Sequence, residues 1–131
     1  MPLNSYLAVA LGSAAGSVLR YSVSLASIAM WGSHFPWGTL LVNLLGSCLI
    51  GWLAATASSA PHSKLARHQP LLMAGFCGGF TTFSLFSLET LHLAQQGSLG
   101  LALLYGIGSL PLCVVAAWAG ERLAFSHQPT S

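Results

Sequence analysis

Charged side chains are scarce in this sequence. Its 131 residues include four Lys and Arg and two Asp and Glu, whereas about 25% of the residues in soluble domains are charged. So few charges cannot form the polar shell of a soluble fold, and 54% of the residues are hydrophobic, so the chain is predicted to lie mostly in lipid. The net charge of +2, with no basic cluster, excludes binding to nucleic acid.

Several features of enzymes, secreted proteins and metalloproteins are also lacking. No Lys or Arg precedes the first apolar run, so no cleavable signal peptide is expected. Cys48, Cys77 and Cys113 are odd in number and lie far apart in apolar segments, which predicts buried small side chains rather than disulfides or a zinc site. No histidine has metal-ligand spacing, and no nucleophile–base pair or phosphate-binding glycine motif occurs. An enzyme is therefore not expected.

Long apolar stretches dominate what is present. A membrane-spanning helix takes about 20 residues. Four such spans are predicted, and together they form one all-α transmembrane domain, 1–131, whose last residues, 126–131, are expected to be disordered. The predicted spans cover residues 5–30, 37–57, 69–93 and 99–125.

The few basic residues specify the orientation in the membrane only weakly. With four spans, both termini and the 58–69 loop share one side, which collects Lys64, Arg67 and Arg122, while Arg20 lies toward the other side. The positive-inside rule therefore favours both termini inside the cell. A chain with so little charge could insert in both orientations.

The third predicted span is interrupted by glycines and hydroxyl groups. Residues 75–89 read GFCGGFTTFSLFSLE. Non-helical backbone survives in hydrocarbon only where it is buried in protein or lines an aqueous cavity. A break at CGGFTT would free carbonyl groups to hold a small dehydrated cation, as in selectivity filters and broken transporter helices. The alternative is a continuous helix whose glycines serve close packing.

Two phenylalanines follow the glycines. A rotation of 100° per residue places Phe83 and Phe86 on one side of the second half of this span. An aromatic ring is positive at its edge, so the two rings could present their edges to an anion. They could equally pack against lipid or neighbouring helices.

Polar side chains in the other spans complete the candidate pathway. Asn43 lies near the middle of the second span, with Thr39 one turn before it, and its amide suits either an anion or a bridge between two helices. Tyr105 and Ser109 form a similar i, i+4 pair on the fourth span. Arg20 either anchors the chain at the interface or lines a water-filled mouth.

Three stretches resemble the signatures of the Fluc (CrcB) family of fluoride channels: GSAAGSVLRY, PWGTLLVNLLGS and GFCGGFTTFSLFSLE. The resemblance covers nearly the whole chain. It implies a passive channel through which a prokaryote discharges fluoride across its plasma membrane, which is the inner membrane in a Gram-negative cell. It also implies an antiparallel, dual-topology homodimer with two pores.

The resemblance further assigns roles to single residues. It implies a structural Na⁺, not transported, that the backbone carbonyls of Gly78 and Thr81 hold at the dimer interface. Asn43 matches the pore asparagine of the family, and Phe83 and Phe86 match its pore-lining phenylalanines. Tyr105 and Ser109 look like its polar track, whereas Pro111 and Cys113 stand where relatives often carry hydroxyl groups. The predicted fluoride pathway is Thr39, Asn43, Phe83, Phe86, Tyr105 and Ser109, with Arg20 in the vestibule.

Two other functions stay open on the sequence alone. A small multidrug or proton-coupled transporter also has about four spans, but it would need a titratable acid at membrane depth. The first span has no acid, and Glu89 lies toward the end of the third. The third possibility is a non-conducting subunit of a larger assembly.

Overall fold

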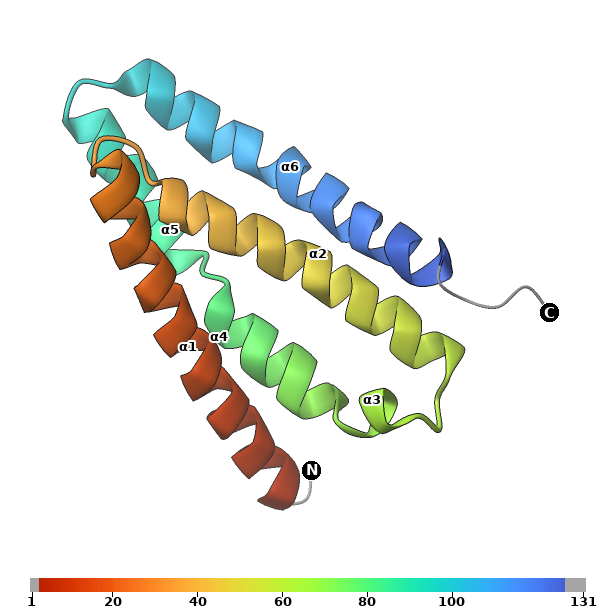
Figure 1. Cartoon of the computed structure of the whole chain (residues 1–131). Coiled ribbons are helices and arrows are strands. Elements are labelled where there is room, and N and C mark those ends of the chain that lie inside the picture. The colour runs from red at the N-terminus through yellow and green to blue at the C-terminus, as the bar shows by residue number, and fades with distance from the viewer. Residues whose placement is uncertain (1–2, 127–131) are drawn as a thin grey trace.

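All regular structure in the part of the chain that is described, residues 3–126, is helical (Figure 1). The computed structural model thus confirms the predicted all-α class. The predicted disordered tail lies outside the described residues except for Ser126, which is the last residue of a helix. In chain order the helices are α1 (Leu3–Trp31), α2 (Trp37–Ser59), α3 (Lys64–Arg67), the π-helix η1 (Pro70–Cys77), α4 (Gly78–Phe80), α5 (Ser84–Gln95) and α6 (Leu99–Ser126).

Three helical segments within the described residues are long and apolar enough to cross a membrane. They are Trp37–Ser59, Pro70–Gln95 and Leu99–Ser126. Helix α1 is long enough, with 29 residues, but its serines and Arg20 make it less apolar, and it is not among the three. That α1 is a fourth span stays a prediction.

The long segments alternate in direction, so the chain runs up and down (Figure 1). The α1–α2 and α5–α6 loops lie together at one end, and the loop that carries α3 lies at the other. Gly32 lies in the α1–α2 loop and Gly97 in the α5–α6 loop, with φ values of 78° and 86°. Glycine suits this left-handed conformation because it has no Cβ to collide with the backbone.

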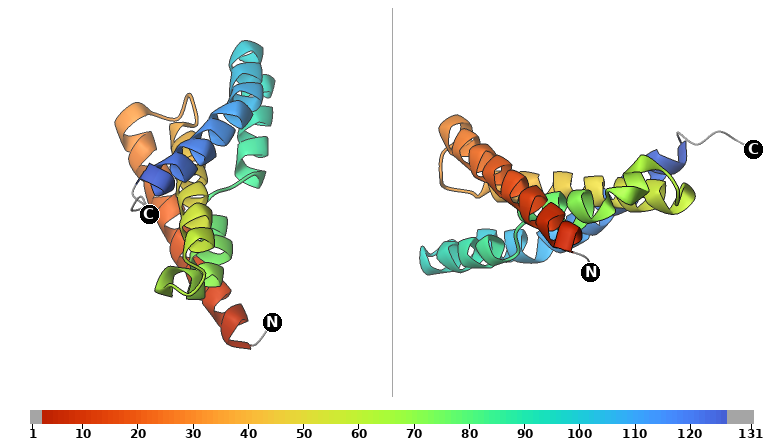
Figure 2. Two further views of the ribbon diagram at one scale, coloured as in Figure 1. Left: turned by 90° about the vertical axis from the view of Figure 1, so that its right-hand side faces the viewer. Right: turned by 90° about the horizontal axis from the view of Figure 1, so that it is seen from below.

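Close contacts between backbones set how the helices pack. Helix α1 lies along η1 and α4, α2 lies along α6, and α5 meets α6 (Figures 1 and 2). Gly16 and Gly79 lie where α1 crosses the third segment, and a Cβ on Gly79 would lie 2.8 Å from the Cα of Ser13. Small residues allow this approach, which stabilises helix pairs in lipid by van der Waals contact. The packing brings α1 directly against the start of the interruption.

Candidate functional site

Residues 81–83 separate α4 from α5 and are not helical. Thr81 is extended, with φ −87° and ψ 160°, and its hydroxyl donates to the Cys77 carbonyl at 2.9 Å. On the other side, the Leu85 N–H donates to Thr82 Oγ1 at 3.1 Å. That hydroxyl satisfies one of the N–H groups left without a partner at the start of α5. The two threonines therefore close the two ends of the interruption.

Asn43 of α2 braces the interruption from the side. Its Nδ2 donates to the Thr82 carbonyl at 3.0 Å, and its Oδ1 accepts from the Thr82 N–H at 2.8 Å. The two partners fix the orientation of the amide, because only its oxygen can accept and only its nitrogen can donate. Asn43 thus links α2 to the non-helical residues 81–83, and one of its two Nδ2 hydrogens is still available to another acceptor.

Arg20 of α1 contacts the same region from the opposite side. Its Nε donates to the Gly79 carbonyl at 3.1 Å, and the Ser17 hydroxyl donates to that carbonyl at 3.4 Å. In an unbroken helix the Gly79 carbonyl would accept from the N–H four residues later. Arg20 replaces that donor, so its side chain lies at the interruption and not at the end of α1.

Three carbonyl groups at the interruption keep no donor in the described part of the chain, and that of Phe80 is one of them. The other two, those of Gly78 and Thr81, accept no hydrogen bond from residues 3–126. Their partners in a continuous helix would be the N–H groups of Thr82 and Leu85. The first of these donates to the Asn43 side chain and the second to the Thr82 side chain. Side chains have therefore diverted both donors and left two oxygen ligands of the kind that hard cations prefer.

A cavity of about 480 Å³ opens beside this point, over α2 and between the third segment and α6. We call it the α2 cavity. It contains six of the predicted site residues and no charged side chain. Its lining residues are Asn43, Gly46, Ser47, Ile50, Met73, Ala74, Cys77, Gly78, Thr81, Thr82, Phe83, Phe86, Ser109, Leu110 and Cys113.

The two phenylalanines of the cavity have different surroundings. Phe86 is 7% exposed and packs against Tyr105, with 4.9 Å between ring centroids. Phe83 is 72% exposed, and its nearest ring is Phe86 at 5.7 Å. Phe86 is thus part of the core between α5 and α6, whereas Phe83 presents its ring to whatever surrounds the protomer.

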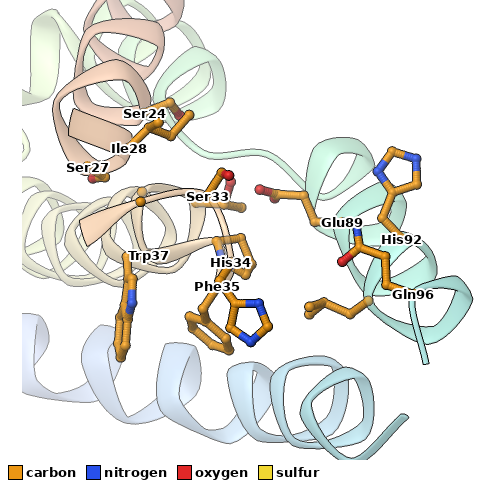
Figure 3. A pocket seen from close by; sticks show the side chains of 15 residues that line it. Ser24, Ser27, Ile28, Ser33, His34, Phe35, Trp37, Glu89, His92 and Gln96 are labelled. Carbon is orange, nitrogen blue, oxygen red and sulfur yellow. The ribbon is translucent and has the colours of Figure 1, made fainter. Parts of the chain in front are cut away.

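Thr39 and Tyr105 do not line the α2 cavity. Thr39 lines a second cavity, of about 220 Å³, between the α1–α2 loop and α5 (Figure 3). The side chain of Glu89 points into this cavity, whereas His92 is directed away from it (Figure 3). The Tyr105 hydroxyl donates to Glu89 Oε1 at 3.4 Å, and the Thr39 hydroxyl is within hydrogen-bonding reach of both groups.

Sequence reasoning gave no role to three residues that the structure places at these sites. Glu89 accepts from Tyr105, Ser17 assists Arg20 at the Gly79 carbonyl, and Ser47 lines the α2 cavity. A signal existed only for Glu89, which is one of two acids in the chain, because a charge in a membrane span is costly and usually functional. Serines are too common in these helices to be singled out.

These features define an all-helical, multi-pass membrane protein with an uncharged, mostly apolar cavity that contains amide and hydroxyl groups beside an irregular segment. Comparison with known proteins specifies the class further. The profile of the family described as "CrcB-like protein, Camphor Resistance (CrcB)" matches residues 7–121, and the chain belongs to this family.

Several relatives from bacteria carry the name fluoride-specific ion channel FluC. The protein of Opitutus terrae is 46% identical over 125 residues, which are 93% of each chain. That of Magnetococcus marinus is 50% identical over 115 residues, 86% of this chain and 90% of its own. One from Thermus thermophilus is 48% identical over 123 residues, 94% of this chain and 95% of its own. The family is one of channels, which confirms that the chain is not an enzyme.

Proposed function

We propose that this chain forms a passive, fluoride-selective channel that discharges cytoplasmic fluoride across a prokaryotic plasma membrane and so relieves fluoride toxicity. The observation that carries the proposal is the α2 cavity, because it joins amide and hydroxyl groups to aromatic rings without a fixed charge. A lining of this kind favours a small anion that makes short hydrogen bonds over a larger one. The names of the relatives support the same ion.

The hydrogen bonds of the cavity separate available donors from occupied ones. The hydroxyl hydrogens of Thr81 and Ser109 are already donated to the carbonyls of Cys77 and Tyr105. The Ser47 hydroxyl makes no hydrogen bond within residues 3–126, and Asn43 uses only one of its two Nδ2 hydrogens. Asn43 and Ser47 therefore supply the donors for an anion in the cavity, and Ser109 would have to rotate in order to donate.

The proposed channel is an antiparallel homodimer of four-span chains with dual topology, and the interruption lies at mid-depth. A structural Na⁺ fits the carbonyl groups of Gly78 and Thr81, because both are oxygens that lack a donor. One chain supplies two such ligands, and a second copy related by two-fold symmetry would supply two more. The proposed ligands are the two backbone carbonyls, whereas the Thr81 hydroxyl donates its hydrogen to the Cys77 carbonyl.

Flux from liposomes tests the proposal. We expect rapid fluoride efflux once a cation ionophore balances charge, and far slower chloride efflux. Equal rates for the two anions would contradict the proposal. Efflux that depends on a proton gradient would identify a carrier, and no efflux would identify a non-conducting subunit. Replacing Na⁺ by a large organic cation should lower the melting temperature of the detergent-solubilised dimer, and an unchanged value would remove the cation site.

A further inference from the structure

Three sulfur-containing side chains line the α2 cavity. Met73 and Cys77 belong to η1 and lie about one turn apart, and Cys113 comes from α6 across the cavity. Cys77 is 1% exposed, Met73 and Cys113 are half-buried, and both cysteines are free thiols. The remaining cysteine, Cys48, does not line the cavity. Two helical segments thus place sulfur around one space.

These groups suit a different class of ion from the one that the channel is proposed to carry. A thiol is a weak hydrogen-bond donor, so it is a poor partner for a hard anion such as fluoride. Thiolates and thioethers are the ligands that select Cu⁺ and chemically similar soft cations. The flexible side chain of Met73 can adjust to a bound ion. No group of three or more His, Cys, Asp and Glu residues gathers in the described part of the chain, so a zinc-type site is not offered.

We propose that the α2 cavity is a binding site for a soft monovalent cation, Cu⁺ or Ag⁺, held by the sulfur atoms of Cys77 and Cys113 with support from Met73. The metal replaces the proton of a thiol, so each thiolate that forms releases one proton, and no oxidant or reductant is needed. The bound cation would occupy the space that Asn43 and Phe83 also line. We further infer that this bound cation blocks fluoride efflux, and this second part rests on the proposed function.

Calorimetric titration with Ag⁺ tests the binding site without reference to flux. Purified protein in detergent is titrated in a chloride-free nitrate buffer, because chloride would precipitate silver. The C48S variant should bind Ag⁺ as tightly as the wild type, since Cys48 lies outside the cavity. The C77S/C113S double variant, which keeps Cys48, should bind at least about 100-fold more weakly, and M73L about 10-fold more weakly.

The matched variants make the result decisive. Binding by C77S/C113S that equals the wild type, or loss of binding in C48S, would overturn the site. Gel filtration of each variant shows whether the fold is kept, and C77S and C113S are also measured singly. If only C77S fails to fold, C113S alone decides: it should bind at least about 10-fold more weakly than the wild type, and unchanged affinity would overturn the site.

Fluoride efflux then tests the block. Silver nitrate added to C48S liposomes should stop efflux, and excess dithiothreitol should restore it by removing the silver. Tight Ag⁺ binding with unchanged efflux would overturn the block but keep the site. If the wild type conducts no fluoride, the proposed function fails, and the titration still decides whether the metal site exists.

Discussion

Replacing Asn43 by alanine tests whether one side chain holds the interruption in place. The variant loses both hydrogen bonds to Thr82 and leaves the backbone N–H and carbonyl of that residue without partners. An unsatisfied buried polar group costs about 1–3 kcal/mol. The two groups border a cavity that can admit water, so each should cost about 1 kcal/mol, the lower end of this range. We therefore expect N43A to lower the free energy of unfolding by about 2 kcal/mol.

Unfolding in detergent, followed through the fluorescence of the four tryptophans, measures this change, and fluoride efflux is measured on the same preparation. Asn43→Asp keeps an acceptor for the Thr82 N–H but turns a second oxygen toward the Thr82 carbonyl and adds a charge to an uncharged cavity, so it should be at least as destabilising as N43A. Ser47→Ala is the matched control, because it removes a donor to the cavity but no hydrogen bond of the fold. It should slow efflux and leave stability unchanged. An N43A protein as stable as the wild type would refute the role of Asn43 as a brace.

Four further substitutions, in two pairs, probe the packing of the helices and the aromatic rings. Gly79→Ala should destabilise the protein by about 1–3 kcal/mol or prevent folding, because the new Cβ meets the backbone of α1. Gly100→Ala is the control, because the space around Gly100 is open. In the same detergent assay it should be neutral or stabilising by up to about 1 kcal/mol. Equal melting temperatures for the two would contradict the packing. Phe86→Ile should cost about 0.5–1.5 kcal/mol for the lost ring pair, and Phe83→Ile should leave the stability of the protomer unchanged. Both should slow efflux if ring edges solvate the anion, and normal efflux in both would return these rings to ordinary packing.

The bounds of the three segments that are long and apolar enough to cross a membrane could be predicted closely from the sequence. The predicted third span, 69–93, corresponds to Pro70–Gln95, and the fourth, 99–125, to Leu99–Ser126. Apolar runs of this length have few alternatives, and Gly97 marks the turn between them through its positive φ. The sequence predicts an interruption at CGGFTT, residues 77–82, whereas Gly78–Phe80 are helical and only residues 81–83 are not, and the depth of this stretch in a membrane stays a prediction.

The partners of the polar side chains could not be predicted from residue spacing. Spacing along a helix tells which side chains share a face, but not which residue of a distant segment lies opposite. Arg20 and Asn43 therefore carried open alternatives, and their partners lie 59 and 39 residues away in the sequence. For the same reason, the sequence predicts Thr39, Tyr105 and Asn43 in one pathway, although only Asn43 lines the α2 cavity.

The difference between the two phenylalanines has another cause. A rotation of 100° per residue applies only within a helix. Phe83 precedes Ser84, the first residue of α5, but its φ of −90° and ψ of −35° are helical, and its carbonyl accepts from the Ser87 N–H at 2.9 Å. The helical projection therefore applies to both rings, which lie 5.7 Å apart, and they differ in exposure because Phe86 also packs against Tyr105.

The contact between Arg20 and Gly79 has a consequence for the order of events at the ribosome. The two residues are 59 apart, which at a synthesis rate of roughly 5–20 residues per second means a delay on the order of 3–12 seconds. Over that interval the Arg20 guanidinium lacks the Gly79 carbonyl, and if α1 is the predicted fourth span, a charge at the centre of the bilayer costs about 2.5–3.5 kcal/mol on insertion scales. Helix α2 is completed during the same interval, yet it supplies no acceptor for Arg20 among the described hydrogen bonds. Arg20 of the first helix therefore gains its hydrogen-bond acceptor only when the third segment has been synthesised.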